Sequence, residues 1–158
     1  MNLQLENQNV NFYHWSHIPI EKIEDRIYSQ TAPSLKSKGF WFSKNTEWID
    51  WCESSECCYS KDSAHMYKLN IDFSNVLIID TLEKLTAFQS KYSDRYGKYI
   101  NWNAVTTDYS GIYFDNYQEI KSNLSSGQQL LTFSWYFAID VNSGCIFDCE
   151  IIKKFVQC

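Results

Sequence analysis

Histidine, serine and carboxylate side chains occur at separated points of this chain, in settings where a fold could bring them together. His14 lies within YHWSH, and Ser43 ends the aromatic run FWF. Asp140 and Ser143 belong to AIDVNSGC, and Glu150 belongs to CIFDCEIIKKFV. An imidazole can exchange a proton, a hydroxyl can hydrogen-bond a ligand, and a carboxylate can balance a developing positive charge. We therefore expect one imidazole, one hydroxyl and one acid to converge on a shared pocket.

Each of these residues also has an ordinary structural interpretation, and the sequence leaves both interpretations open. His14 is flanked by bulky aromatic residues, which suits a histidine at the end of a strand. Ser43 can serve as a turn residue or a helix cap. Asp140 and Ser143 can bond local backbone N–H groups in a hairpin turn, and Glu150 can be a solvated carboxylate on a strand.

His14 and Ser16 match half of the paired His-x-Ser/Thr motif of phosphoesterases that cleave cyclic phosphates. That reaction requires two histidines, one acting as acid and the other as base. His17 and His65 stand in HIP and HMY, and neither completes a second copy of the motif. The sequence therefore disfavours this chemistry.

Cysteines gather after the aromatic run, and a histidine follows them at a distance that suggests a metal-ligand set. Cys52, Cys57, Cys58 and His65 have the spacing C-x4-CC-x6-H. Structural zinc usually takes ligands in short regular pairs such as C-x-x-C, because each hairpin then supplies half of a tetrahedron. We therefore expect free thiols in a reducing compartment and no metal site.

Composition predicts one folded domain of 158 residues with a loose polar leader over residues 1–8. Hydrophobic residues make up 44% of the chain and aromatic residues 17%, which excludes wholesale disorder. The net charge of −5 and the lack of a Lys or Arg block argue against duplex nucleic acid, and against a stacking platform for single-stranded RNA. The chain shows no long apolar run and no secretory leader, so we expect a cytoplasmic protein without a membrane segment.

Hydrophobic periodicity predicts an α+β fold with a mainly antiparallel sheet flanked by short helices. Strands are expected at 9–16, 40–42, 66–73, 76–80, 111–117, 132–140 and 145–156. Helices are expected at 20–29, 47–52, 81–92 and 100–109, a helical turn at 118–124, and loops at 53–63 and 125–129. A turn at 142–144 would join the last two strands into a β-hairpin.

The segment KGFWFSKNTEWIDW combines several of these signals. Gly39 suits a turn before the aromatic strand, and Ser43 ends that strand. Asn45 or Thr46 can cap the following helix, on which Trp48 and Trp51 share one face. The pattern of strand, hydroxyl-bearing turn and helix would present a serine to a ligand.

The order of these elements resembles the ADP-ribosyltransferase fold. The features in common are an aromatic strand carrying His14, a second strand that ends at Ser43 before a helix, and a late pair of antiparallel strands. More narrowly, KGFWFSKNTEWIDWC and WYFAIDVNSGCIFD look like segments of a little-characterised group of cellular and viral proteins. The resemblance touches most of the chain and implies a domain that binds NAD.

The resemblance also implies roles for individual residues. His14 would hold the adenosine ribose of NAD, and Ser43 would brace the nicotinamide pocket. Aromatic walls and the rim of the pocket would come from Tyr13, Trp41, Tyr136 and Ser143. The catalytic acid would be Glu150 or Asp140, and neither stands in the Glu-x-Glu or Gln-x-Glu setting that is usual in the family.

The chemistry that the resemblance implies is cleavage of the bond between nicotinamide and ribose through an oxocarbenium-like transition state, as in glycoside hydrolysis. A carboxylate near the ribose hydroxyls would balance the developing positive charge. ADP-ribose would then pass to a protein or small-molecule acceptor. The alternative is a non-catalytic nucleotide- or protein-binding module on the same fold, which the missing Glu-x-Glu motif favours.

Overall fold

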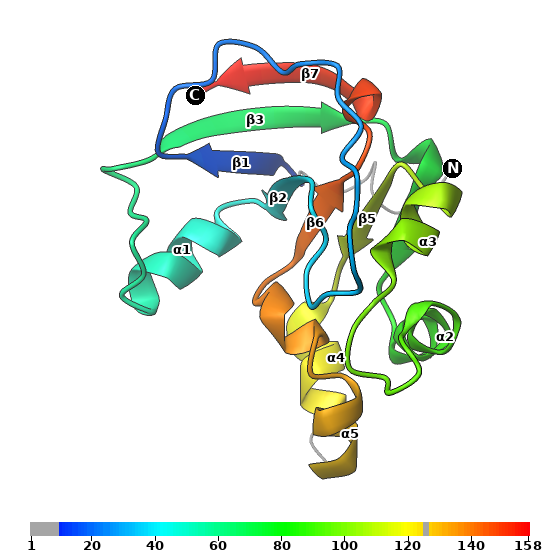
Figure 1. The fold of residues 1–158 in the computed structure, drawn as a ribbon. Coiled ribbons are helices and arrows are strands. Elements are labelled where there is room, and N and C mark those ends of the chain that lie inside the picture. The colour runs from blue at the N-terminus through cyan, green and yellow to red at the C-terminus, as the bar shows by residue number, and fades with distance from the viewer. Residues whose placement is uncertain (1–9, 125–126) are drawn as a thin grey trace.

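The computed structural model describes residues 10–124 and 127–158. The expected leader at 1–8 lies outside these residues, and so do Ser125 and Ser126 of the expected loop at 125–129. The described chain forms a seven-stranded sheet in the order β4-β5-β6-β2-β1-β3-β7, with helices beside it (Figure 1). The strands are β1 (Phe12–Ser16), β2 (Phe40–Lys44), β3 (His65–Ile71), β4 (Val76–Ile79), β5 (Gly111–Phe114), β6 (Ser143–Ile146) and β7 (Ile152–Gln157). The helices are α1 (Glu47–Ser54), α2 (Leu82–Tyr92), α3 (Trp102–Asp108), α4 (Tyr117–Asn123) and α5 (Gly127–Thr132), with short 3-10 helices η1 (Phe73–Asn75), η2 (Tyr136–Ile139) and η3 (Cys149–Ile151).

The sheet changes direction along its width. In Figure 1, β1, β3 and β7 run almost level across the top of the molecule, whereas β2, β6 and β5 slope away beneath them. β4 and β5 pair in parallel, and the other ladders are antiparallel. The expected α+β class and the mainly antiparallel sheet are therefore confirmed. The change of direction falls between β1 and β2, the strands that carry His14 and Ser43.

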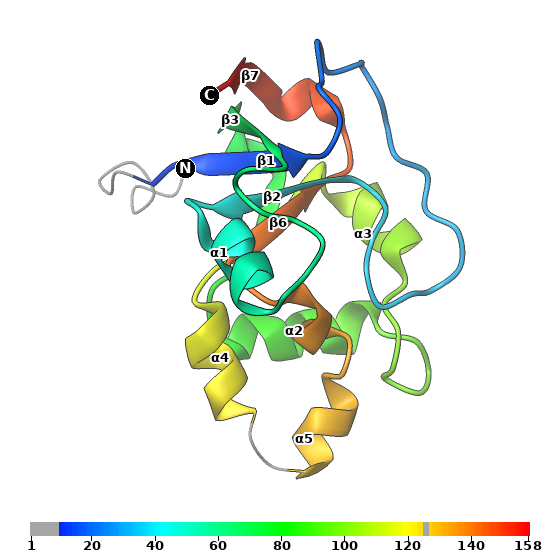
Figure 2. The ribbon, with the colours of Figure 1, turned by 90° about the vertical axis from the view of Figure 1, so that its left-hand side faces the viewer.

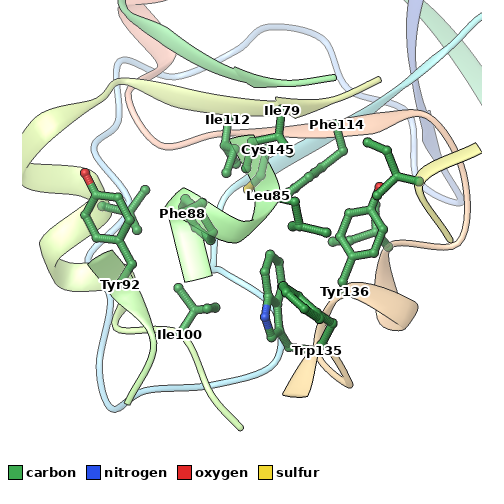
Figure 3. Close-up of a cluster of buried hydrophobic side chains, with 14 of the residues drawn as sticks. Ile79, Leu85, Phe88, Tyr92, Ile100, Ile112, Phe114, Trp135, Tyr136 and Cys145 are labelled. Carbon is green, nitrogen blue, oxygen red and sulfur yellow. The ribbon is translucent and has the colours of Figure 1, made fainter. Parts of the chain in front are cut away.

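The sheet buries a hydrophobic cluster on each face, because successive side chains of a strand point to opposite sides. Ile112 and Phe114 of β5 belong to the larger cluster, which also takes in residues of α2 and α3 (Figure 3). Tyr113, which lies between them in sequence, belongs to the smaller cluster together with Phe12 and Phe42. Helices thus cover one face of β5, and the other face packs against the aromatic side chains of β1 and β2.

Residues 17–39 form a strap that joins β1 to β2 without a helix or a strand of its own (Figure 2). The helix expected at 20–29 is therefore wrong. Tyr28 instead donates its backbone N–H to the Phe147 carbonyl at 2.8 Å, and Ile23 packs against the smaller hydrophobic cluster. These tertiary contacts override the helical spacing of the isoleucines, whose β-branched side chains favour a helix only weakly.

The C-terminal third differs most from the sequence prediction. The strand expected at 132–140 is wrong, because α5 ends at Thr132 and η2 follows shortly after it. Phe133, Tyr136 and Ile139 are all buried. This spacing of three residues, together with the burial of the adjacent Trp135, fits helical turns, whereas a strand with one buried face would bury only every second residue.

The expected β-hairpin at the end of the chain is also wrong. Residues 142–144 do not form a turn, since Ser143 begins β6, which lies between β2 and β5. η3 interrupts the strand expected at 145–156, and β7 pairs with β3 on the far side of the sheet. In the described part of the expected loop at 125–129, Gly127 begins α5. Alternation of apolar and polar residues predicts a strand but does not specify its partner. The sequence therefore could not distinguish a hairpin of the last two expected strands from pairing with distant strands.

The helices expected at 81–92 and 100–109 are confirmed as α2 and α3. Thr81 Oγ1 accepts a backbone N–H bond from the first turn of α2 at 3.2 Å, and Asn101 Oδ1 does the same for α3 at 3.4 Å. Such caps satisfy N–H groups that have no partner inside the helix. Within residues 10–124 and 127–158, none of the helices has both the length and the apolar character needed to cross a bilayer.

Candidate functional site

The strands β1 and β2 separate just beyond their last ladder pair. That pair joins Tyr13 to Ser43. The next side chain, that of His14, places its Nδ1 2.7 Å from the Trp41 carbonyl oxygen. On its other edge, β2 remains paired with β6, where Trp41 lies opposite Cys145. A side chain of β1 thus satisfies a carbonyl of β2, and the two strands part around this contact.

A pocket of about 270 Å³ opens beside the point where the strands part. Its lining residues are Tyr13, His14, Trp15, Trp41, Phe42 and Ser43 from β1 and β2, Lys36 from the strap, Trp48 from α1, Tyr59 from the loop after α1, and Ile139 and Ser143 from η2 and β6. Aromatic residues dominate this lining, and no described Asp or Glu belongs to it. A largely apolar cavity with a few polar groups is the usual form of a small-molecule site.

Tyr59 enters the lining as the centre of an aromatic stack. Its ring centroid lies 3.6 Å from that of His17 with the planes 26° apart, and 4.7 Å from that of Trp48 with the planes 71° apart. On another wall, Lys36 Nζ lies 5.0 Å from the ring centroid of Trp41. Edge-to-face ring contacts and a cation over an indole are both favourable electrostatically. They hold side chains of a loop, a helix and the strap together at the pocket.

His14 is held as a neutral imidazole with a defined tautomer. Burial lowers the pKa of His14, and its hydrogen bond to the Trp41 carbonyl opposes this only in part. A carbonyl only accepts hydrogen bonds, so Nδ1 must carry the proton. The ring stacks on Phe40 with the centroids 4.0 Å apart. Nε2 is then an unprotonated acceptor, and no described residue donates to it.

Two further polar atoms of the lining residues are buried without a hydrogen-bond partner among the described residues. They are Trp15 Nε1 and Ser43 Oγ. Trp15 is 9% exposed and Ser43 is 2% exposed, so neither side chain is open to bulk solvent. Ser143, by contrast, donates from its Oγ to the Val141 carbonyl at 3.1 Å. Buried polar groups in folded proteins nearly always have a partner, so each exception requires an explanation such as water or a ligand.

Both expected catalytic acids lie outside the lining of the pocket. Glu150 is exposed and belongs to η3, so its expected place in the final strand is wrong. Asp140 does not end a strand but follows η2 with a φ of 70°, one residue beyond the lining residue Ile139. Within the described chain, the structure therefore brings together the expected imidazole and hydroxyl, His14 and Ser43, but no acid joins them in the lining.

Of the residues expected to contact the cofactor, Tyr13, His14, Trp41, Ser43 and Ser143 line the pocket. Tyr136 does not. It is fully buried in the larger hydrophobic cluster, where its ring centroid lies 5.1 Å from that of Tyr117. Burial also raises the pKa of Tyr136. Its place as a pocket wall depended on the strand at 132–140, and the structure replaces that strand with helical turns.

The pocket also contains residues that the sequence did not single out. Trp15 lies two residues after Tyr13 on the same strand, so alternation could have placed both on one face. Lys36 comes from the strap and Tyr59 from the loop after α1, two segments without regular structure. No local pattern in the sequence indicates where such segments pack.

The thiol and histidine side chains give no metal site in the part of the chain that the structure describes, where no group of three or more His, Cys, Asp or Glu residues could hold an ion. Comparisons with protein-family models, with curated proteins and with solved structures find no match to this chain. The pocket between β1 and β2 is thus the feature from which a function has to be inferred.

Proposed function

We propose that this protein binds a nucleotide in the pocket between β1 and β2, and that the nucleotide is NAD. The observation that carries the proposal is an aromatic lining in which two residues, Trp15 and Ser43, each bury a polar atom (Nε1 and Oγ) without a partner in the described chain. Aromatic side chains stack on planar bases with a gain of roughly 1–3 kcal/mol per base. A bound ring can thus stack on the apolar walls, and its polar substituents can pair with these atoms if Trp15 or Ser43 turns towards the pocket.

Charged and hydrogen-bonding groups of the lining suit the remainder of a nucleotide. Lys36 forms no ion pair with a described carboxylate, so its ammonium group is available for a phosphate. His14 offers Nε2 as an acceptor for a ribose hydroxyl, because its proton is on Nδ1. A nucleotide satisfies the aromatic, cationic and acceptor groups at the same time.

The size of the pocket limits how much of NAD it can enclose. Its volume of about 270 Å³ lies just below the range of roughly 300–1,000 Å³ that is usual for small-molecule pockets. One nucleoside-sized part would therefore be enclosed, and the other half of the dinucleotide would lie along the surface. We expect AMP or nicotinamide mononucleotide to retain much of the affinity.

Binding is better supported than transfer of ADP-ribose. An oxocarbenium-like transition state needs a carboxylate beside the ribose, in a site from which water is excluded. No described Asp or Glu lines the pocket, and Asp140 and Glu150 lie outside it. We therefore place a non-catalytic binding module first. Transfer through Asp140 would require this residue to move into the pocket when the ligand binds.

Calorimetric titration with NAD, AMP, nicotinamide mononucleotide and nicotinamide tests the proposal. We expect saturable binding of NAD and of at least one mononucleotide. Trp48→Ala removes a wall of the pocket and should weaken binding about fivefold or more, because one stacking contact is worth roughly 1–3 kcal/mol. Trp51→Ala is the matched control, since Trp51 lies on the same helix and does not line the pocket.

Three results would contradict the binding module. If none of these compounds binds, or if Trp48→Ala and Trp51→Ala weaken binding equally, the pocket is not the nucleotide site. If the unmodified protein releases nicotinamide from NAD and Asp140→Ala abolishes the release, the protein is a transferase or glycohydrolase and not only a binder.

A further inference from the structure

The end of α1 brings two cysteines together. The Ser55 N–H donates to the Trp51 carbonyl at 2.9 Å, and the Cys57 N–H reaches back to the Cys52 carbonyl at 2.9 Å. Glu56, between these donors, has a φ of 53°, which is the left-handed conformation. A backbone bond from the second residue past a helix cap to the last turn is the Schellman arrangement, which brings the residues at its two ends close together. Here those residues are Cys52 and Cys57.

The two thiols of this pair have different environments. Cys52 is fully buried, and burial raises the pKa of its thiol to about 12. Cys57 is half-buried. Hydrogen bonds lower the pKa of its thiol, and the backbone N–H of Tyr59 contributes more to this than the Cys52 thiol does. Cys57 is therefore the better nucleophile of the two, because the thiolate is the reactive form. Cys52, by contrast, keeps its proton at neutral pH.

We propose that Cys52 and Cys57 form an oxidation-sensitive pair, in which Cys57 is the thiol that hydrogen peroxide attacks and Cys52 closes a disulfide with it. The backbone bond from Cys57 to Cys52 holds the two residues side by side at the helix end, so we expect the disulfide to form while α1 stays helical. Cys58 is exposed and adjacent in sequence, and it is the competing thiol against which the assignment has to be tested.

The reaction balances with hydrogen peroxide as the oxidant. The Cys57 thiolate forms a sulfur–oxygen bond while the peroxide O–O bond breaks, which leaves a sulfenic acid on Cys57 and releases hydroxide. Cys52 then loses its proton, and its sulfur forms the disulfide as the sulfenic oxygen leaves as water. In sum, two thiols are oxidised to one disulfide, and one peroxide is reduced to two waters.

The pair adjoins the proposed ligand site. Trp48 lies on the helix that carries Cys52, and Tyr59 lies two residues after Cys57; the two rings contact each other with centroids 4.7 Å apart. A disulfide would fix the loop that carries Tyr59 to α1, and it would thereby hold this wall of the pocket. That effect on ligand affinity rests on the proposed nucleotide site. Formation of the disulfide does not depend on that site, so an experiment can disprove either proposal without affecting the other.

Peptide mapping after graded peroxide treatment tests the pair. The full chain is oxidised, quenched with acid, alkylated and digested, and the masses of the fragments are measured by mass spectrometry. We expect a Cys52–Cys57 link to appear at the lowest peroxide doses and to disappear with a reductant. In the untreated protein, limiting iodoacetamide should label Cys57 several-fold faster than the exposed Cys158.

Variants separate this pair from its neighbours. Cys58→Ser should leave the link intact. Cys57→Ser, at a half-buried position, should abolish it without unfolding the protein, as circular dichroism would show. In Cys52→Ser, a dimedone adduct should accumulate on Cys57, because the thiol that closes the disulfide is gone. A link between Cys57 and Cys58, or labelling of Cys57 no faster than that of Cys158, would overturn the proposal.

Discussion

Two regions of this molecule use the same aromatic residues and treat their polar atoms differently. In the larger hydrophobic cluster, Trp102 Nε1 donates to the Ser34 carbonyl at 3.1 Å, and Trp135 Nε1 donates to Gln89 Oε1. In the pocket, Trp15 Nε1 is buried without a partner among the described residues. A buried donor left unpaired costs roughly 1–3 kcal/mol. The comparison teaches that aromatic content alone does not distinguish a site from a core, and that unpaired polar atoms point to a site only where their residues line an open cavity.

Tyr136 shows why this condition is needed, because its hydroxyl is also buried without a partner in the described chain. Its ring is fully buried against Phe114 and Tyr117, with centroids 5.9 Å and 5.1 Å away, and it lines no part of the pocket. One unpaired atom in tight ring packing is therefore not evidence of a ligand. The pocket differs because two unpaired atoms belong to residues that line one open cavity.

The largest expected loss of stability comes from a substitution in the larger hydrophobic cluster. Trp135→Ala should lower the free energy of unfolding by about 3–5 kcal/mol, because it removes a fully buried ring and leaves a cavity. Trp48→Ala, at a half-buried position of the pocket, should cost less than half as much. Urea unfolding followed by circular dichroism measures both. Equal losses would mean that the pocket wall is packed as tightly as the core.

A second effect concerns the buried amide of Gln89. Its Nε2 donates to the Gly97 carbonyl at 2.9 Å and to the Thr132 carbonyl at 3.1 Å, and its Oε1 accepts from Trp135. Gln89→Leu should destabilise the protein by roughly 2–3 kcal/mol, because it leaves buried donors and acceptors unpaired. Ser90→Ala, at an exposed position of the same helix, should change the unfolding free energy by less than about 0.5 kcal/mol. A small loss for Gln89→Leu would show that water replaces these bonds.

Two serines sharpen the comparison within the pocket. Ser143→Ala should cost about 1 kcal/mol, because Ser143 Oγ bonds the Val141 carbonyl. Ser43→Ala should be neutral or slightly stabilising in the free protein, because Ser43 Oγ has no partner in the described chain. The same change should weaken NAD binding if the hydroxyl meets the ligand. Urea unfolding measures the change in stability, and calorimetry measures the change in affinity for NAD. A loss of stability in Ser43→Ala would mean that Ser43 Oγ has a hydrogen-bond partner inside the protein.

The smallest expected effect is a dependence of stability on pH that comes from His14. Burial lowers the pKa of His14 in the folded protein below its usual value of about 6.5. As pH falls below that value, the unfolded chain takes up the proton first, so the folded state loses stability until pH passes the lowered pKa. His14→Gln should therefore lose less stability than the unmodified protein between about pH 8 and about pH 5. Identical slopes for the two proteins would mean that His14 is not held neutral.

Local signals predicted the elements that stand at the centre of the site. Thr46 stands at the N-cap of α1 as expected, but its side chain makes no capping hydrogen bond. The aromatic runs of β1 and β2 are properties of a few adjacent residues, and the structure contains both strands. His14 and Ser43 therefore came together as expected. Their meeting follows from the pairing of two strands that are close in sequence.

The remaining errors share one physical cause. The strap holds its shape through main-chain bonds such as that from Tyr28 to Phe147, and the segment around η2 through burial on several sides. Neither kind of contact produces a periodic pattern of hydrophobic residues in the sequence. Lys36 and Tyr59 were missed for this reason, and Glu150 was placed in the wrong element because η3 interrupts the expected strand.

The pairing of β2 with β6 joins Phe40 to Ile146, positions from distant parts of the polypeptide. Such long-range contacts form slowly, because the chain between them must first be ordered. A nascent chain that has made β1, β2 and α1 but not yet β6 would therefore lack the Ser143 side of the pocket. A ligand that recognises only the finished pocket would stabilise the mature protein by mass action and leave incomplete chains unprotected.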